Sequence, residues 1–185
     1  MGPVWHMISA SANHGCISIV LKTTLTSATG GLYFPALEQT EAVTLRSFTA
    51  ALIRQGIGVS QPLRSWEDAI TLLFSATGDH PRALVIDEFP LLVKESPSLP
   101  SIIQRELGPG GSGGDSRARL ILCGSAMTVM GHLPAGQAPL RGRASLELPV
   151  RPFGYREAAA FWGVTDPQLA RGLRRHSGRG RPGCR

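Results

Sequence analysis

Short runs of consecutive apolar residues recur along the chain, and two of them lead directly into polar residues. The clearest is residues 83–86, Ala-Leu-Val-Ile, which are followed by Asp87 and Glu88. A second run, residues 120–123 of the segment 118–123, is followed by glycine and Ser125. Continuous apolar runs of this length are typical of strands buried on both faces, as in a parallel sheet that helices cover. Both segments are therefore predicted to be central strands.

Helices are expected between these strands, because apolar residues recur there at helical spacing. The clearest helix begins after Thr40, its predicted N-cap, and ends at Gly56. Its apolar face is predicted to consist of Val43, Leu45, Phe48, Leu52 and Ile53. A second helix begins after Ser65, where the sequence Ser-Trp-Glu-Asp resembles a capping box. This helix is expected to direct inward Trp66, Ile70, Leu73 and Phe74.

Weaker patterns complete the predicted fold. Further strands are predicted at residues 17–21, 32–34 and 144–150, and further helices at residues 97–107, 126–132 and 155–162. Loops are predicted at residues 27–31, 108–114 and 134–142, and residues 1–16 are predicted to be irregular. The glycine-rich residues 108–114 are interpreted as a mobile surface loop, because no Lys-Ser/Thr pair follows them and a strand comes next. Strands that alternate with helices predict an α/β fold with a mostly parallel sheet flanked by helices.

Composition agrees with one globular domain, and the charge is confined to one end. The chain has 185 residues, of which 42% are hydrophobic, and a net charge of +6. Six of the 19 basic residues are arginines in residues 171–185, so the remaining 13 balance the 13 acidic residues. We expect this Arg/Gly-rich tail to be disordered and to bind nucleic acid weakly at most, because it has no aromatic residue to stack on bases.

Cysteine usage and hydropathy indicate the compartment. Cys16, Cys123 and Cys184 are odd in number and far apart, which disfavours a disulfide framework or a zinc site and favours a reducing, cytoplasmic setting. Cys123 is expected to be a buried core residue. No apolar stretch approaches the length of a membrane span, and the early sequence does not match a signal peptide, so no membrane association is expected.

The carboxylate pair is the strongest candidate for chemistry. Open α/β sheets bind ligands beyond the carboxyl ends of their strands, where Asp87 and Glu88 are predicted to lie. Asp87 is suited to hold a hydrated Mg²⁺, and Glu88 to orient or deprotonate a water that attacks a phosphate. A core strand that surfaces at an acidic turn is the alternative interpretation. Ser125, at the end of the neighbouring strand, is suited to contact a γ-phosphate or the attacking water, or to cap the helix that follows it.

Several ordered motifs carry a resemblance to a known family. They are Leu-Val-Ile-Asp-Glu-Phe-Pro at residues 84–90, Leu-Ile-Leu-Cys-Gly-Ser at 120–125, Pro-Leu-Arg-Gly-Arg at 139–143, and Leu-Glu-Leu-Pro-Val-Arg-Pro-Phe at 146–153. In this order they resemble a prokaryotic ATPase family with an AAA-like P-loop core, the archaeal-type ATPase domain, in which an apolar strand followed by Asp-Glu is the Walker B motif. The resemblance covers about residues 31–170.

The resemblance implies an ATP-binding protein with Mg²⁺-dependent ATP hydrolase activity and assigns roles to individual residues. It makes Asp87 the Mg²⁺ residue, Glu88 the catalytic base and Ser125 the sensor residue. Arg143 becomes a phosphate-facing arginine or a structural one that forms a salt bridge. The family's phosphate loop would bind nucleotide through a Lys-Thr pair, which Lys22 and Thr23 match most closely.

The two ends of the chain depart from the family pattern. Leu21 stands where the phosphate loop should have its second glycine, and Cys16 where it should have its first. We therefore divide the chain into an atypical segment at residues 1–30, an ATPase core at 31–170 and the tail at 171–185, and hypothesise that the ends are truncated or frame-altered. The alternative function is a non-catalytic interaction module with a degenerate nucleotide site. The sequence is compatible with a homo-oligomer or with binding to a protein partner.

Overall fold

The structure is a computed structural model. It describes residues 4–10, 21–76, 81–114, 116–142, 144–150, 155–161 and 163–165. At residues 4–10 and 21–23, and at a few positions in later helices and strands, the description covers the backbone only.

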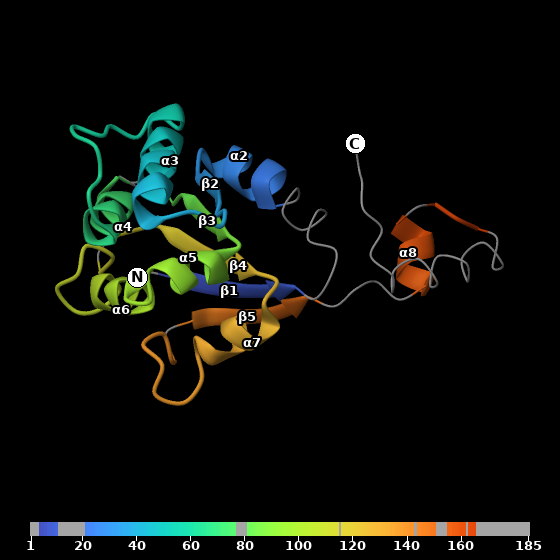
Figure 1. Cartoon of the computed structure of the whole chain (residues 1–185). Coiled ribbons are helices and arrows are strands. Elements are labelled where there is room, and N and C mark those ends of the chain that lie inside the picture. Colours follow the sequence, from blue (N-terminus) through green and yellow to red (C-terminus); the bar gives the residue numbers. More distant parts are fainter. Residues whose placement is uncertain are drawn as a thin grey trace.

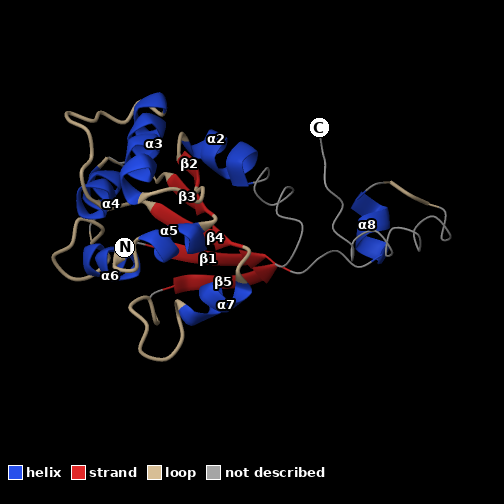
Figure 2. Ribbon diagram, viewed as in Figure 1, coloured by secondary structure: helices blue, strands red, loops and turns tan. Residues whose placement is uncertain are grey.

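A five-stranded sheet forms the centre of the molecule, with helices around it (Figures 1 and 2). The strands are β1 (Val4–Ala10), β2 (Leu32–Pro35), β3 (Ala83–Asp87), β4 (Arg119–Gly124) and β5 (Ala144–Val150). They lie side by side in the order β2-β3-β4-β1-β5, and every neighbouring pair is parallel. The predicted α/β fold with a parallel sheet is therefore confirmed.

The two central strands lie next to each other, as their shared pattern predicts. β3 pairs with β4 in parallel, with Leu84 opposite Leu120 and Ile86 opposite Leu122. All four of these side chains are at most 1% exposed. Because the strands are parallel and in register, their carboxyl ends lie at the same edge of the sheet.

The prediction for the first strand was wrong. β1 is Val4–Ala10, within the stretch predicted to be irregular. The predicted strand at residues 17–21 lies outside the described residues except for Leu21, which begins a helix. β1 has polar residues at positions 6 and 9, so it lacks a continuous apolar run; its strand conformation instead follows from backbone pairing with β4 and β5 on both sides.

Eight helical segments connect or follow the strands in the described part of the chain. They are η1 (Leu21–Thr26, a π-helix), α2 (Ser27–Thr29), α3 (Glu41–Arg54), α4 (Trp66–Ser75), α5 (Phe89–Glu95), α6 (Leu99–Glu106), α7 (Met127–His132) and α8 (Tyr155–Phe161). The helices predicted from periodicity are confirmed. Residues 27–29 are helical where a loop was predicted, and α5 was not predicted, because it begins directly after β3 with a proline in its first turn. None of the described helices is long and apolar enough to cross a membrane.

The main core lies between one face of the sheet and helices α3 to α7. Phe34 of β2, Phe48 of α3 and Trp66 of α4 form its aromatic centre, with ring centroids 5.0 Å apart for the first pair and 5.6 Å for the second. Both contacts are edge-to-face, which is the favourable arrangement for aromatic rings. The predicted apolar face of α3 is confirmed at Leu45, Phe48 and Leu52, which are buried. Ile53 is instead 57% exposed, because Thr44 and Ala51 occupy the rest of the buried face.

The start of α4 is fixed by the predicted cap. The Ser65 hydroxyl oxygen accepts a hydrogen bond from the Asp68 backbone N–H at 3.1 Å. The next residue, Trp66, is 2% exposed and donates its indole N–H to the Ser96 hydroxyl at 3.1 Å. Ser96 in turn donates to the Glu41 carboxylate. This relay ties α3 and α4 to the segment between α5 and α6.

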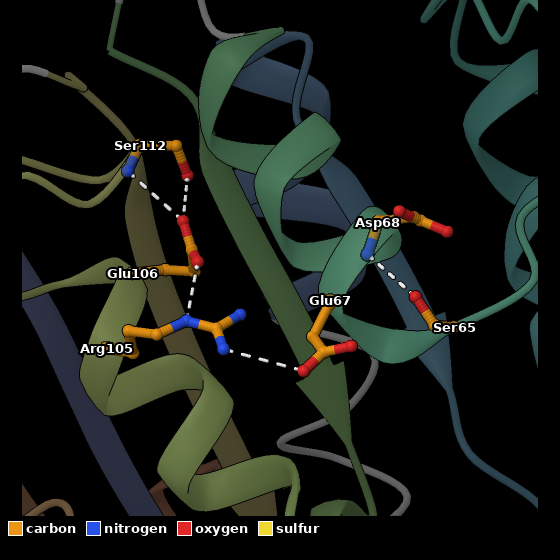
Figure 3. Close-up of polar contacts among 6 residues, drawn as sticks. All are labelled: Ser65, Glu67, Asp68, Arg105, Glu106 and Ser112. Carbon is orange, nitrogen blue, oxygen red and sulfur yellow. Dashed lines mark hydrogen bonds and ion pairs between the residues drawn. The ribbon is translucent and has the colours of Figure 1, made fainter.

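The glycine-rich residues 108–114, predicted to be a mobile surface loop, form turns that a buried carboxylate anchors (Figure 3). Glu106 is 8% exposed, and its carboxylate accepts from the Ser112 hydroxyl at 2.7 Å and from the Ser112 N–H at 3.1 Å. Arg105 contacts the same carboxylate and also Glu67 of α4. Burial alone would raise the pKa of Glu106, but the hydrogen bonds from Ser112 and the charge of Arg105 hold that pKa below its ordinary value.

Candidate nucleotide site

The connections between strands change direction at β4 and β1, which are neighbours in the sheet. From β1 the chain passes to β2 at one edge of the sheet, returns through β3 to β4, and then passes β1 to reach β5. The connections that leave β4 and β1 therefore run in opposite directions. Ligands of open parallel sheets bind at such a point, beyond the carboxyl ends of the strands. Ser9 of β1 lies opposite Gly124 of β4, so the end of β1 is beside the end of β4.

Asp87 is the last residue of β3 and is half-buried at this edge. One carboxylate oxygen, Oδ2, accepts a hydrogen bond from the Tyr33 hydroxyl of β2 at 2.6 Å. The other, Oδ1, accepts from the Glu88 backbone N–H at 3.1 Å. Donors to both oxygens therefore hold the carboxylate at this edge of the sheet.

Glu88 has a backbone conformation that is unusual for a glutamate. Its φ of 53° and ψ of 40° are left-handed, and no other non-glycine residue in the described part of the chain has a positive φ. This conformation turns the chain from β3 into α5 within one residue. The Glu88 Oε2 atom accepts from the Ser125 hydroxyl at 3.1 Å and lies 3.4 Å from the Ser125 N–H. The left-handed turn therefore directs the carboxylate toward the end of β4.

Ser125 directly follows β4 and contacts the Glu88 carboxylate. Its alternative role as a helix cap is wrong, because the N-cap of α7 is Ala126, and the Ser125 hydroxyl is directed to Glu88 instead. Gly124 allows this close arrangement, since a Cβ atom at that position would lie 2.4 Å from the Pro90 Cδ atom of α5. Only glycine lets α5 pack this tightly against β4.

Cys123 is a buried residue of β4 close enough to feel the charges of the carboxylate pair. It is 4% exposed, which confirms that it is a core residue. Burial raises the pKa of its thiol, and the negative charges of Asp87 and Glu88 raise it further, so the thiol stays protonated.

The structure brings together three of the residues predicted for the site: Asp87, Glu88 and Ser125. Lys22 and Thr23 lie in the first turn of η1, the helix that follows β1 in the chain, and only their backbone is described. Arg143 lies outside the described residues. Tyr33 was missed, because its contact with Asp87 joins residues 54 positions apart and a tyrosine within a short apolar strand carries no sequence signal of its own.

The donor set suits Mg²⁺ better than a closed metal site. In the described part of the chain no three His, Cys, Asp or Glu side chains cluster closely enough to hold a metal ion by themselves. Mg²⁺ in nucleotide sites is held by one or two carboxylates, with waters and phosphate oxygens as the other ligands. Asp87, a half-buried carboxylate at the carboxyl end of a parallel strand, fits that requirement.

The parallel sheet and the helices around it form an α/β fold that is similar to the folds of solved structures, a Walker-type ATPase among them. A structure of the Aeropyrum pernix ORC2 protein with ADPNP and ADP matches 88% of this chain and 45% of that protein, with a TM-score of 0.62 and 15% identity. Its ADP form matches 93% of this chain and 47% of that protein, with a TM-score of 0.64 and 14% identity. The Walker-type ATPase PABY2304 of Pyrococcus abyssi matches 96% of this chain and 55% of that protein, with a TM-score of 0.60 and 15% identity.

The similarity in sequence covers less of the chain than the similarity in structure. No model of a known protein family matches the chain. An uncharacterized protein of Methanocaldococcus jannaschii is 30% identical over 82 residues, which are 44% of this chain and 18% of that protein. The chain spans about half the length of the similar solved structures and less than a fifth of this relative. These similarities are to the fold and to a short stretch of sequence.

Proposed function

We propose that this chain binds ATP together with Mg²⁺ at the carboxyl edge of β3, β4 and β1. The observation that carries the proposal is the contact between the ends of β3 and β4. There the Ser125 hydroxyl lies 3.1 Å from the carboxylate of Glu88, and Glu88 directly follows Asp87 in the chain. An acid pair and a hydroxyl at the carboxyl ends of adjacent parallel strands are suited to a metal ion and a phosphate. The likeness to the ORC2 protein, whose structures hold ADPNP and ADP, supports a nucleotide as the ligand.

Each residue has a distinct role in this proposal. Asp87 holds a water of the hydrated Mg²⁺, and the ion would neutralise charge on the phosphates. Glu88 is the base that orients the attacking water, and Ser125 senses the γ-phosphate. Lys22 and Thr23, at the start of the helix after β1, are placed in the chain to contact the phosphates, and Arg143 is a further candidate for that contact.

Hydrolysis requires one change from the arrangement seen. Glu88 accepts its hydrogen bonds from Ser125, so the carboxylate that would activate water is already engaged. A γ-phosphate that draws the Ser125 hydroxyl to itself would release Glu88 for the water. In this arrangement, binding comes first, and turnover depends on whether the bound phosphate competes successfully for Ser125.

A non-catalytic interaction module is the second candidate, and the sequence at the start of η1 favours it. Leu21 precedes Lys22 where a phosphate loop has glycine. Each charge-assisted hydrogen bond of a phosphate loop contributes about 1.5–3 kcal/mol. Loss of most of them would weaken ATP binding by several powers of ten, since about 1.4 kcal/mol corresponds to tenfold in affinity.

Calorimetric titration of the purified chain with ATP, in Mg²⁺ and in EDTA, distinguishes the two candidates. Micromolar binding that is tighter with Mg²⁺ is expected, and Asp87→Asn should abolish the Mg²⁺ effect. Asp68→Asn, which changes an exposed carboxylate on α4, is the matched control and should bind as the wild type does. Glu88→Gln should keep binding and lose turnover. Absence of binding up to millimolar ATP would refute the proposal and leave the interaction module.

A further inference from the structure

The Tyr33 hydroxyl contacts the candidate metal residue Asp87, and the proposed roles do not use it. It lies in β2 opposite Val85 of β3, and its ring packs against the apolar cluster of Val85, Ile121 and Cys123. From this position the hydroxyl donates to Asp87 Oδ2 at 2.6 Å. This short distance is typical of a hydroxyl that donates to a charged carboxylate.

Two donors from different directions hold the Asp87 carboxylate. The Tyr33 hydroxyl binds Oδ2, and the Glu88 N–H binds Oδ1 at 3.1 Å. A carboxylate with a donor on each oxygen has little freedom to rotate about its side-chain bonds. The tyrosine ring, packed on the sheet, fixes the direction from which its hydroxyl approaches.

We propose that Tyr33 is a positioning residue for Mg²⁺, which acts by holding Asp87 in the orientation that accepts a metal-bound water. The inference rests on the proposed function, since it assigns Mg²⁺ and nucleotide to this edge of the sheet. Partners that orient a metal ligand from outside the coordination shell affect metal affinity by about 10- to 100-fold. Loss of the Tyr33 hydroxyl therefore weakens the contribution of Mg²⁺ to nucleotide binding by about tenfold and leaves Mg²⁺-free binding unchanged.

The test uses the full chain and the variant Tyr33→Phe, which removes the hydroxyl and keeps the ring in the apolar cluster. ATP affinity is measured in EDTA and over a Mg²⁺ titration, which gives the Mg²⁺ concentration at half-maximal effect. We expect this concentration to rise about tenfold in Tyr33→Phe, while the affinity in EDTA stays at the wild-type value. Tyr155→Phe is the matched control, since Tyr155 is the other tyrosine of the chain and begins α8.

A double-mutant cycle separates positioning from a purely structural role. Once Asp87→Asn has removed the metal-binding carboxylate, Tyr33→Phe should cause no further change in the Mg²⁺ dependence. An unchanged Mg²⁺ dependence in Tyr33→Phe overturns the inference and leaves the proposed function intact. Equal weakening with and without Mg²⁺, or the same effect of Tyr33→Phe with Asn at position 87, also overturns it. A wild-type chain that binds no ATP in either condition overturns both proposals.

A second measurement covers the case in which Tyr33→Phe does not fold. In Tyr155→Phe protein, Tyr33 is the sole remaining tyrosine, so isotope labelling of the tyrosine ring carbon that bears the hydroxyl gives one NMR signal. We expect this signal to shift when Mg²⁺ is added to the ATP-bound protein. A signal that does not respond to Mg²⁺ contradicts the positioning role.

Discussion

The left-handed conformation of Glu88 gives a sharp prediction for stability. We compare Glu88→Gly with Glu88→Ala, because both variants remove the carboxylate and its contacts with Ser125 equally. The two differ in their tolerance of a φ of 53° and a ψ of 40°. Glycine adopts this conformation without steric cost, whereas alanine has a Cβ atom that crowds the following carbonyl oxygen.

The magnitude follows from two opposing effects. A left-handed conformation costs a residue with a Cβ atom about 1–2 kcal/mol. Against this, glycine makes the unfolded chain more flexible and so lowers stability by about 0.4–1 kcal/mol relative to alanine. Their difference leaves Glu88→Gly more stable than Glu88→Ala by about 1 kcal/mol.

Urea unfolding followed by tryptophan fluorescence measures this difference, with Glu95 as the matched site. Glu95 is the exposed last residue of α5 and does not have a positive φ. At position 95 the order should therefore reverse, with alanine more stable than glycine by up to about 1 kcal/mol. If alanine were as stable as glycine at position 88, Glu88 would not be left-handed in solution, and the geometry that directs it to Ser125 would be wrong.

Two further predictions concern packing and pH. Gly31→Ala should lower the free energy of unfolding by at least about 3 kcal/mol, because its Cβ atom would lie 2.0 Å from the backbone oxygen of Ala83. Gly58→Ala is the control and should be nearly neutral, because its Cβ atom would have nothing within 4 Å. Thermal unfolding measures both variants. Glu106→Gln should lower the free energy of unfolding at neutral pH. Ser112 and Arg105 depress the folded-state pKa of Glu106, so its carboxylate stabilises the fold above the unfolded-state pKa of about 4.3. This stabilisation is lost as the pH falls through the folded-state pKa. The free energies of unfolding of wild type and variant, measured in urea, should therefore converge in acid.

The elements that sequence predicts well are those whose signal is local. β3 and β4 each contain a short apolar run next to turn-forming or polar residues, and runs of this length with β-branched residues are typical of buried strands. The start of α4 follows from one cap, Ser65, which is visible within four residues of sequence. The adjacency of β3 and β4 was predictable for the same reason, since two strands buried on both faces belong at the centre of a sheet.

The features that sequence does not predict depend on contacts between distant segments. β1 is a strand because it pairs with β4 and β5, and its own residues alternate too weakly to indicate it. Likewise, the hydrogen bond from Tyr33 to Asp87 requires the register of β2 against β3, which no local pattern contains. The left-handed Glu88 is another such case, because a residue other than glycine adopts this conformation only where the surrounding structure imposes it.

The carboxylate pair at the end of β3 and the Lys22-Thr23 pair in η1 belong to different elements of the fold, and this difference bears on the function of the proposed site. Tyr33 of β2 donates a hydrogen bond to Asp87, and Ser125 after β4 donates one to Glu88, so contacts from both neighbouring strands help to position the two acids. We expect these two contacts to persist when the phosphate loop is altered, so that a metal response at Asp87 can be measured even where ATP binds poorly. For this reason the Mg²⁺ dependence of binding is a more direct measure of the pair than the affinity for ATP itself.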